Sequence, residues 1–368
     1  MTISLLDGLV VVEAGTTVKA GFCGKLLVDA GAEVIKVSLP TSYETPFPEW
    51  LDRGKASVVI DWRIPEGRQL MRRLLGRTDL LVSDFEHGDD AAALGDAASN
   101  HPRLVHTALS ELGSEGPFAD VPATDIIVSA LSGMPFINGE AGRVPLREPG
   151  NQTAIVAALA GYIGSLAAIA NRRLTGEGQA VAVSALEAMV NVLGPSVLQC
   201  SYQLGGPRRR PTADGFLFDC ADGKVSIIIS AQRSWETILD LWGITVDPAD
   251  SEKFTEANRR LNMPAIRALF APVLATRTRR EVFEELCLVH VPCGMLMSPS
   301  DLPDDPHLLE RGSFDTLAYH PHEQPRRVFP GPGFRIAGES PGAERGLSIR
   351  GGDTARILAP LGTAGGAE

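Results

Sequence analysis

Short apolar runs alternate with helical patterns through the first third of this 368-residue chain. Leu9–Gly15 (LVVVEAG) and Glu33–Val37 (EVIKV) are typical of buried strands. Between them, Ala20–Ala30 carries apolar residues at helical spacing and is followed by Gly31, which predicts a helix with a glycine stop. Strands that are separated by helices pair in parallel through right-handed crossovers. The pattern therefore predicts an α/β fold with a parallel sheet.

The same alternation continues after this first unit. Ser57–Trp62 (SVVIDW) predicts a strand, and Pro65 stands where a helix can begin, because a proline at the first helical position gives up no needed N–H donor. Leu80–Phe85 and Arg103–Leu109 predict two further strands of the same sheet.

The middle of the chain is predicted to be helical. Thr153–Ala170 is a run of eighteen residues without a charge, long enough to be weighed as a membrane span. Its Ala, Gly and Ser content favours a buried core helix instead, since these residues drive insertion into lipid only weakly. A second helical stretch is predicted over Val183–Cys200.

The character of the sequence changes after this helical region. Gly205–Gly215 (GGPRRRPTADG) has the composition of a linker, and Asp222-Gly223 between two apolar runs predicts a β-hairpin. Helices are predicted over Ser234–Gly243 and Met263–Leu286, and the Pro- and Gly-rich tail after Met295 is predicted to be extended. The two tryptophans at positions 235 and 242 lie seven apart, which indicates a core-facing helical stripe.

Composition restricts the partners. The formal net charge of -11 argues against a nucleic-acid binder, which needs a basic face. The five cysteines, at positions 23, 200, 220, 287 and 293, are scattered and never spaced CxxC, so neither a zinc site nor a disulfide framework is expected. The first fifteen residues have no basic region followed by a cleavage site, so no signal peptide is predicted. Together these features predict a cytoplasmic protein.

Several catalytic motifs are absent or incomplete. Only Gly15 and Gly21 occur where a G-x-G-x-x-G loop would follow the first strand, which argues against a dinucleotide cofactor. No G-x-S-x-G sequence occurs. His87 and His106 have no metal-ligand spacing, so structural roles are expected for both and no metal site is predicted.

Six sequence blocks occur in an order that resembles one known family. They are AGFCGKLLVDAGAEVIKV (20–37), LDRGKASVVIDWRIPEGRQL (51–70), TDLLVSDFEHG (78–88), HPRLVHTALSELGSEGPFADVPATDIIVSALSG (101–133), RRLTGEGQAVAVSALEA (172–188) and VPCGMLMSPSDLPDDPHLLERGSF (291–314). The chain resembles the family III CoA-transferases, also called the CaiB/BaiF family, over about 300 residues.

The resemblance implies a Rossmann-like large domain with a smaller inserted α+β domain, in an interlocked dimer. It implies a large domain over 1–200, a linker over 201–215, a small domain over 216–300 and a return to the large domain over 301–368. It also implies transfer of CoA between an acyl-CoA and a carboxylic acid, with CoA as substrate and no permanently bound cofactor.

Family members use an aspartate nucleophile that attacks the thioester. Counting 25 residues back from Gln179, or nine forward from Pro145, places Ala154 at that position. The acid nearest to it upstream is Glu148, a weak candidate for a displaced nucleophile. Asp125 in PATD is a second weak candidate, with a helix N-cap as its structural alternative. The sequence therefore assigns no catalytic residue.

Other positions bear on racemase chemistry and on CoA binding. Related racemases carry a histidine where this chain has Thr124. The phosphates of CoA call for cationic donors, and Lys36, Arg53 and Lys55 are the candidates, with an exposed surface pair as the alternative for Arg53 and Lys55. Further departures from the family pattern are Lys19, Ser38, Glu86 and His87, together with a C-terminal block that survives only as SIRGGDTARIL (348–358).

Two alternatives to an active transferase follow from these departures. One is a catalytically silent subunit that pairs with an active paralogue. The other is a protein that binds acyl-CoA or an acyl carrier without reacting with it. The expected partners are therefore an acyl-CoA or organic acid and a second chain, identical or paralogous, but no nucleic acid and no membrane.

Overall fold

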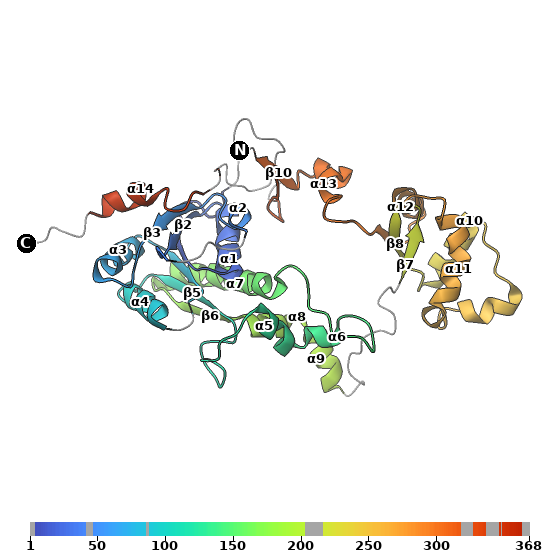
Figure 1. Cartoon of the computed structure of the whole chain (residues 1–368), viewed down its shortest axis with the longest axis horizontal. Coiled ribbons are helices and arrows are strands. Elements are labelled where there is room, and N and C mark those ends of the chain that lie inside the picture. The colour runs from blue at the N-terminus through green and yellow to red at the C-terminus, as the bar shows by residue number, and fades with distance from the viewer. Residues whose placement is uncertain are drawn as a thin grey trace, which may run out of the picture. The chain divides into compact units, whose positions relative to one another are not determined.

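The computed structural model describes residues 4–41, 47–85, 88–202, 216–317, 327–335, 346 and 348–362 (Figure 1). They form two compact units. Unit 1 comprises residues 1–139, 143–209 and 312–368, and unit 2 comprises residues 140–142 and 210–311. Most of the predicted linker 201–215, together with Glu86 and His87, lies outside the described residues.

A six-stranded sheet forms the centre of unit 1. Its strands are β1 Val10–Ala14, β2 Glu33–Ser38, β3 Ala56–Val59, β4 Leu80–Ser83, β5 Val105–Ser110 and β6 Ala180–Ser184. They pair in the order β3-β2-β1-β4-β5-β6, and every pair is parallel. The predicted parallel-sheet α/β architecture is confirmed.

Helices cover both faces of this sheet, as a parallel sheet requires. Val11 and Leu80 point to a core shared with α1 (Val18–Asp29) and α7 (Gln152–Thr175). Val12 and Leu81, one position along each strand, point to a second core shared with α3 (Pro65–Leu75), α4 (Gly88–Ala98) and α14 (Thr354–Leu358). The alternation of side chains along each strand thus creates two separate cores.

The C-terminal segment protects the edge strand β3. The Asp353 carboxylate accepts from Ser57 N at 3.0 Å, and the Thr354 hydroxyl accepts from Val59 N at 3.2 Å. Ile357 then packs into the second core. An edge strand with unpaired N–H groups invites aggregation, so this segment satisfies donors that would otherwise be exposed.

The remaining described elements of unit 1 surround the sheet. They are α2 Pro48–Leu51, α5 Asp125–Ser132, α6 Met134–Ile137, α8 Ala185–Val192, α9 Gly194–Ser201, the hairpin β10 Phe314–Leu317 with β11 Arg327–Pro330, and the short 3-10 turn Ala359–Leu361. The helix predicted over Val183–Cys200 is wrong in detail. Its first residues end strand β6, and a break at Leu193–Gly194 separates α8 from α9.

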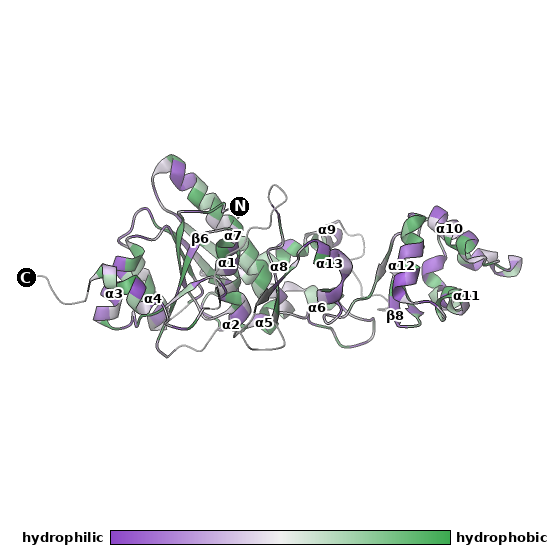
Figure 2. Cartoon of the chain, turned by 90° about the horizontal axis from the view of Figure 1, so that it is seen from above, coloured by the Kyte–Doolittle hydropathy of each residue, from purple (hydrophilic) through white to green (hydrophobic). Residues whose placement is uncertain are grey.

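Helix α7 is long and apolar enough to cross a membrane by length and composition alone. Ala157, Ala158 and Ile169 lie in the core between α7, α1 and β5, and the Ser165 hydroxyl bonds Thr107 of β5 at 2.7 Å. One face of α7 is therefore a core face, as predicted, whereas Leu159 and Ile163 on another face are exposed. Figure 2 shows the apolar colouring along most of this helix.

Unit 2 is a small α+β body with its own core. It contains β7 Leu217–Cys220, β8 Gly223–Ile227, β9 Cys293–Met295, α10 Gln232–Trp242, α11 Met263–Leu274, α12 Arg279–Leu288, α13 Pro306–Glu310 and 3-10 turns at Pro248–Phe254, Arg259–Leu261 and Leu302–Asp304. Strands β7 and β8 form the predicted hairpin at Asp222-Gly223. Trp235 and Trp242 are buried around Phe270, as the helical stripe indicates.

Two further predictions need correction. The helix predicted over Met263–Leu286 is two helices, because the capping box of Thr278 and Glu281 starts α12 anew. The tail after Met295 is not simply extended, since it contains α13, β10, β11 and α14.

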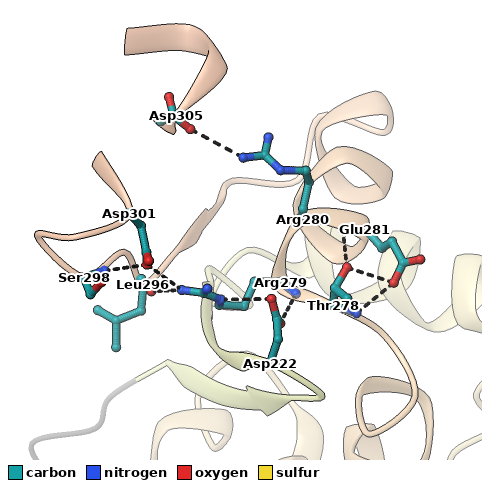
Figure 3. Close-up of polar contacts among 9 residues, drawn as sticks. All are labelled: Asp222, Thr278, Arg279, Arg280, Glu281, Leu296, Ser298, Asp301 and Asp305. Atoms are coloured by element: carbon teal, nitrogen blue, oxygen red, sulfur yellow. Dashed lines mark hydrogen bonds and ion pairs between the residues drawn. The ribbon is translucent and has the colours of Figure 1, made fainter. Parts of the chain in front are cut away.

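Arg279 connects three parts of unit 2 (Figure 3). Its backbone N–H and guanidinium donate to Asp222 in the hairpin turn, and its guanidinium also donates to the Leu296 carbonyl at 2.6 Å. Asp301 lies 3.4 Å from the same guanidinium and accepts from Ser298 N. The segment after β9 is thereby fixed to the hairpin and to the start of α12.

Candidate functional site

The sheet order marks the carboxyl ends of β1 and β4 as the edge where a ligand crevice is expected. Successive strands lead away from β1 in opposite directions, to β2 and β3 on one side and to β4, β5 and β6 on the other. Ligands of open parallel sheets bind outside the carboxyl ends of the strands at such a reversal. The side chains at this edge of unit 1 therefore make up the candidate site.

Asp84 occupies the start of α1 at this edge. Its carboxylate accepts from Thr16 N at 3.0 Å, from Thr17 N at 2.8 Å and from the Thr17 hydroxyl at 2.5 Å. In dinucleotide-binding folds these N–H groups hold a phosphate. A β-carbon on Gly15 would lie 2.9 Å from Asp84 Oδ1, so the carboxylate fits closely against the glycine. The N–H groups of Thr16 and Thr17 thus have a partner within the chain.

Ala154 lies near the start of helix α7, at the same carboxyl edge of the sheet. Ser165 bonds Thr107, whereas a β-carbon on Gly161 would lie 2.7 Å from Leu109 Cδ2, so α7 runs antiparallel to β5. Residues N-terminal to Gly161 therefore lie toward the carboxyl edge. Ala154 follows the start of α7 at Gln152 and is partly exposed there.

Asp125 lies next to this start of α7. Its carboxylate accepts a hydrogen bond from the Thr153 hydroxyl and lies 3.3 Å from Arg147 Nη2. Asp125 is the first residue of α5, and Thr124 rather than Asp125 is the N-cap, so the capping alternative is wrong. Both carboxylate oxygens are engaged by partners.

Glu148 meets the same face of α5. The Ser129 hydroxyl donates to Glu148 Oε2 at 2.7 Å, and Ser129 lies one helical turn after Asp125. Glu148 Oε1 is buried and has no hydrogen-bond partner among the described residues. The structure thus brings Asp125, Glu148 and the residue before Ala154 together around the first turns of α5 and α7.

A further ion pair at this edge was missed by the sequence analysis. Lys19 Nζ lies 2.7 Å from Glu111 Oε1, and Lys19 is only 2% exposed. Lys19 stands in the first turn of α1, and Glu111 directly follows β5. The sequence marks Lys19 as unusual because the family pattern commonly has a polar or apolar residue there. Its partner Glu111 follows a different strand, so sequence spacing does not identify the pair.

The three cationic candidates for CoA phosphates differ in burial. Lys55 is fully buried between Glu13, at 2.6 Å, and Asp52, at 3.3 Å. Lys36 pairs with Asp52, and Arg53 Nη1 lies 2.7 Å from Asp315 Oδ2. The alternative of an exposed surface pair is therefore wrong for Lys55 and Arg53, whose side chains are 0% and 11% exposed.

Burial also shifts the pKa values of three groups in unit 1, Glu13, Cys23 and His106. Desolvation raises the pKa of Glu13, although the cations of Lys55 and Lys36 oppose the shift. Burial raises the pKa of the Cys23 thiol to about 12, which leaves it protonated and unsuited to nucleophilic attack. Burial lowers the pKa of His106, whose Nε2 lies 2.9 Å from the Ser83 hydroxyl. His106 has a structural partner, and no three metal-ligating side chains gather within the described part of the chain.

Two polar hollows lie beside β2 and β3. One is lined by Lys36, Ser38, Pro48, Asp52, Ser57, Ser348 and Arg350. The other, of about 440 Å³, is lined by Lys55, Ala56, Gly346, Ser348, Ile349, Gly352, Asp353 and Arg356. Its volume is in the range of small-molecule sites. The C-terminal segment contributes to both hollows, so this part of unit 1 contains cations from both ends of the chain.

Comparison with known proteins identifies relatives across nearly the whole chain. The family profile described as CoA-transferase family III matches residues 6–342. The succinyl-CoA–D-citramalate CoA-transferase of Chloroflexus aurantiacus is 28% identical over 333 residues, covering 84% of this chain and 82% of that protein. The succinyl-CoA–L-malate CoA-transferase alpha subunit of the same organism is 27% identical over 337 residues, covering 84% and 78%.

A solved structure supports the fold. The crystal structure of a CAIB/BAIF family protein from Brucella suis superposes with a TM-score of 0.85 at 24% identity, covering 98% of this chain and 100% of that one. The six-stranded parallel sheet and the inserted α+β unit therefore have a counterpart of the same architecture. Since the family profile spans most of the sequence, the chain belongs to CoA-transferase family III.

Proposed function

We propose that this chain binds acyl-CoA thioesters and transfers CoA to a carboxylic acid. The observation that carries the proposal is the group of carboxylates at the carboxyl edge of the sheet, around the first turns of α5 and α7. A carboxylate is the nucleophile that CoA transfer requires, because it forms an anhydride that the CoA thiolate can reopen. The relatives named for succinyl-CoA point to succinyl-CoA as the first donor to test.

Asp125 and Glu148 are the two carboxylates expected from the sequence. Asp125 is bound by Thr153 and Arg147, so an attack through either oxygen first breaks a contact. Among the described residues Glu148 Oε1 has no hydrogen-bond partner, which favours Glu148 of these two. The relevant variants are Asp125→Asn and Glu148→Gln, which remove the negative charge at nearly constant volume.

We place the CoA phosphates beside β2 and β3. Arg350 and Lys36 line one hollow there, and Arg356 and Lys55 line the other. The two arginines are the exposed cations, whereas the Lys55 side chain is fully buried in its ion pairs and contributes charge without direct contact. Arg53 precedes β3. Phosphate oxygens bind strongly to such cations because both partners are ionised. Arg350 also donates to the carbonyls of Leu39 and Pro40, which holds its guanidinium at the end of β2. No permanently bound cofactor is part of the proposal.

The test uses the purified full chain with succinyl-CoA and a carboxylate acceptor such as citramalate or malate. The proposal expects formation of the acceptor's CoA thioester and binding of CoA in calorimetry. Loss of transfer in Glu148→Gln, but not in Asp125→Asn, would assign the reaction to Glu148. A chain that neither binds CoA nor yields any transferred thioester contradicts the proposal.

Helices α5, α6, α8 and α9 of unit 1 carry exposed apolar side chains, which form the face considered for contact with a second chain. The exposed side chains are Ile126 and Leu131 of α5, Phe136 of α6, Val192 of α8 and Val197 and Leu198 of α9. Figure 1 shows these helices along one side of unit 1. Large exposed apolar patches mark interaction sites.

We propose that this face contacts a second chain, identical or paralogous, in the cytoplasm. A related protein carries the name of an alpha subunit, which supports assembly with another chain. Native mass spectrometry of the wild type should show a dimer, and Phe136→Asp should shift it to the monomer. A monomeric wild type at micromolar concentration rejects the identical-chain arrangement and leads to co-expression with a paralogue as the next measurement.

A further inference from the structure

We propose that Glu111 is the carboxylate that attacks the thioester in this chain, and that Lys19 is the cation that holds the released CoA thiolate. The proposal rests on the proposed function, since it assigns the reacting group of the same site. It arises from the buried ion pair between these side chains at the carboxyl edge of the sheet. The position of that pair relative to Ala154 carries the argument.

Two contacts of Gly161 define a reference point from which the height of each residue along the sheet can be counted. A β-carbon on Gly161 would lie 2.7 Å from Leu109 Cδ2 and 3.7 Å from Cys23 Sγ, so α7, β5 and α1 meet there. Glu111 lies two strand positions beyond Leu109, about 7 Å toward the carboxyl edge. Ala154 lies seven helical positions before Gly161, about 10 Å in the same direction.

Lys19 lies at a similar height. Helix α1 begins after the carboxyl end of β1 and ends where Leu6 N donates to the Ala30 carbonyl, so it runs parallel to α7. Lys19 is four residues before Cys23, about 6 Å toward the carboxyl edge. The ion pair is therefore within about one helical turn of the height of Ala154.

Ala154 also lies on the face of α7 that packs against β5. Positions 154, 158, 161 and 165 follow helical spacing and share one face. Ala158 is in the core, Gly161 meets Leu109, and Ser165 bonds Thr107 of β5. The same face at Ala154 is therefore directed to the extension of β5, where Glu111 lies. The small alanine leaves room on that side for a carboxylate that comes from β5.

The ion pair has the properties that the reaction needs. Lys19 is almost completely buried at the start of α1, where the helix dipole disfavours a cation, so it needs a nearby anion. The Glu111 side chain is 16% exposed, so part of its surface is open to a ligand at the carboxyl edge. When Glu111 becomes acylated it loses its charge, and the CoA thiolate takes over the role of counter-ion to Lys19.

The steps balance without an added acid, base or oxidant. A Glu111 oxygen attacks the thioester carbonyl carbon, the carbon–sulfur bond breaks, and CoA leaves as a thiolate while an anhydride forms. The thiolate attacks the Glu111 carbonyl carbon, which gives a glutamyl-CoA thioester and releases the donor acid as a carboxylate. The acceptor carboxylate reverses these two steps and regenerates Glu111. One negative charge moves between carboxylate and thiolate, and Lys19 remains its partner.

The first experiment locates the covalent intermediate on the wild-type chain. The protein is incubated with succinyl-CoA and then treated with borohydride, which reduces a glutamyl thioester to a primary alcohol that peptide mass spectrometry can locate. The proposal expects the modification at Glu111. Modification at Glu148 or Asp125 overturns the Glu111 assignment but keeps the proposed function, whereas no modification and no transfer contradict both.

The second experiment compares matched substitutions. Glu111→Gln should lower kcat by at least about 10³-fold, as expected for loss of a nucleophile. Glu115→Gln, an exposed position in the same loop, should keep the wild-type kcat. Because Glu111→Gln leaves Lys19 buried without that anion, the double variant Lys19→Met/Glu111→Gln restores a neutral site, and it should fold and remain inactive. Activity in a folded double variant overturns the assignment.

Discussion

Glu13 and Lys55 form an ion pair whose two side chains are completely buried. Lys55 also donates to the Gly21 carbonyl at 2.8 Å, so it links β1, α1 and β3. Removing one member of a buried pair costs about 3–5 kcal/mol, because the other charge stays buried without compensation. Lys55→Met should lower the free energy of unfolding by this amount, measured by urea denaturation.

A matched control tests the importance of burial. Arg53→Met removes a pair whose acidic member, Asp315, is 41% exposed, so about 1 kcal/mol or less should be lost. The double variant Glu13→Gln/Lys55→Met should be more stable than Lys55→Met alone. Equal losses for Lys55→Met and Arg53→Met would contradict a burial-dependent pair.

His106 should make stability depend on pH. Burial lowers its pKa in the folded chain below the ordinary value of 6.5, so between these two values the unfolded chain binds more protons. Stability therefore rises with pH in that window and falls as the pH drops below about 6.5, by at most about 1.4 kcal/mol per pH unit. His106→Asn should show a smaller decrease in urea midpoint between about pH 7.5 and 5.5. Equal decreases for both proteins would exclude His106 as the cause.

For single residues, the sequence identifies the charged side chains but not their burial or their partners. Lys36, Arg53 and Lys55 are all basic residues within one short region of the sequence. The Lys55 side chain is nevertheless completely buried, whereas Arg53 pairs with Asp315, which is 41% exposed. The pair of Lys19 and Glu111 joins α1 to the end of β5, and that contact exists only after the sheet has formed. Partners that meet through tertiary structure leave no local pattern.

Among the elements, α1 depends on a glycine inside the helix. A β-carbon on Gly24 would lie 1.8 Å from Glu13 Oε2, so the helix approaches the buried carboxylate as closely as glycine permits. Gly24→Ala should therefore lower the thermal midpoint, although alanine ordinarily favours a helix by about 1 kcal/mol over glycine. A β-carbon on Gly95 in α4 would meet no atom of the described residues within 4 Å, so Gly95→Ala should raise the midpoint. Stabilisation by both substitutions would show that Glu13 moves aside without cost.

Elements were predictable where a local signal marks their ends. Pro65 starts α3, and Asp222-Gly223 turns the β7–β8 hairpin, as the sequence indicates. Strand β6 was missed because it ends at Ser184, the N-cap of α8, and no turn residue separates them. The split between α11 and α12 had a readable signal in the Thr278–Glu281 capping box, which the apolar periodicity of the surrounding residues concealed.

For the whole molecule, the α/β architecture followed from alternation of strand and helix patterns, whereas the course of the C-terminal segment did not. Asp353 and Thr354 bond to the edge strand β3 from the far end of the sequence. Sequence periodicity does not predict such a contact, because it is made by two individual side chains that accept hydrogen bonds from backbone N–H groups. The candidate site has the same character, since its residues come from the loops after β1 and β5 and from the starts of α5 and α7.

Two units with separate cores should respond separately to a core substitution. Phe270 contacts the rings of Phe218, Trp235 and Trp242 at centroid distances of 5.4, 5.6 and 5.1 Å, all within unit 2. Phe270→Ala should cost about 3–5 kcal/mol through the lost burial and the cavity that remains. Hydrogen exchange should then show lower protection for amides of unit 2 and unchanged protection for β1, β4 and β5.

Val82→Ala provides the reciprocal control, because Val82 is fully buried in the sheet core of unit 1. It should lower protection in unit 1 and leave the amides of α10 and α11 unchanged. Cooperative units of local unfolding follow shared packing, and the cores of the two units have no residue in common. A uniform loss of protection in both variants would show that the two units unfold as one.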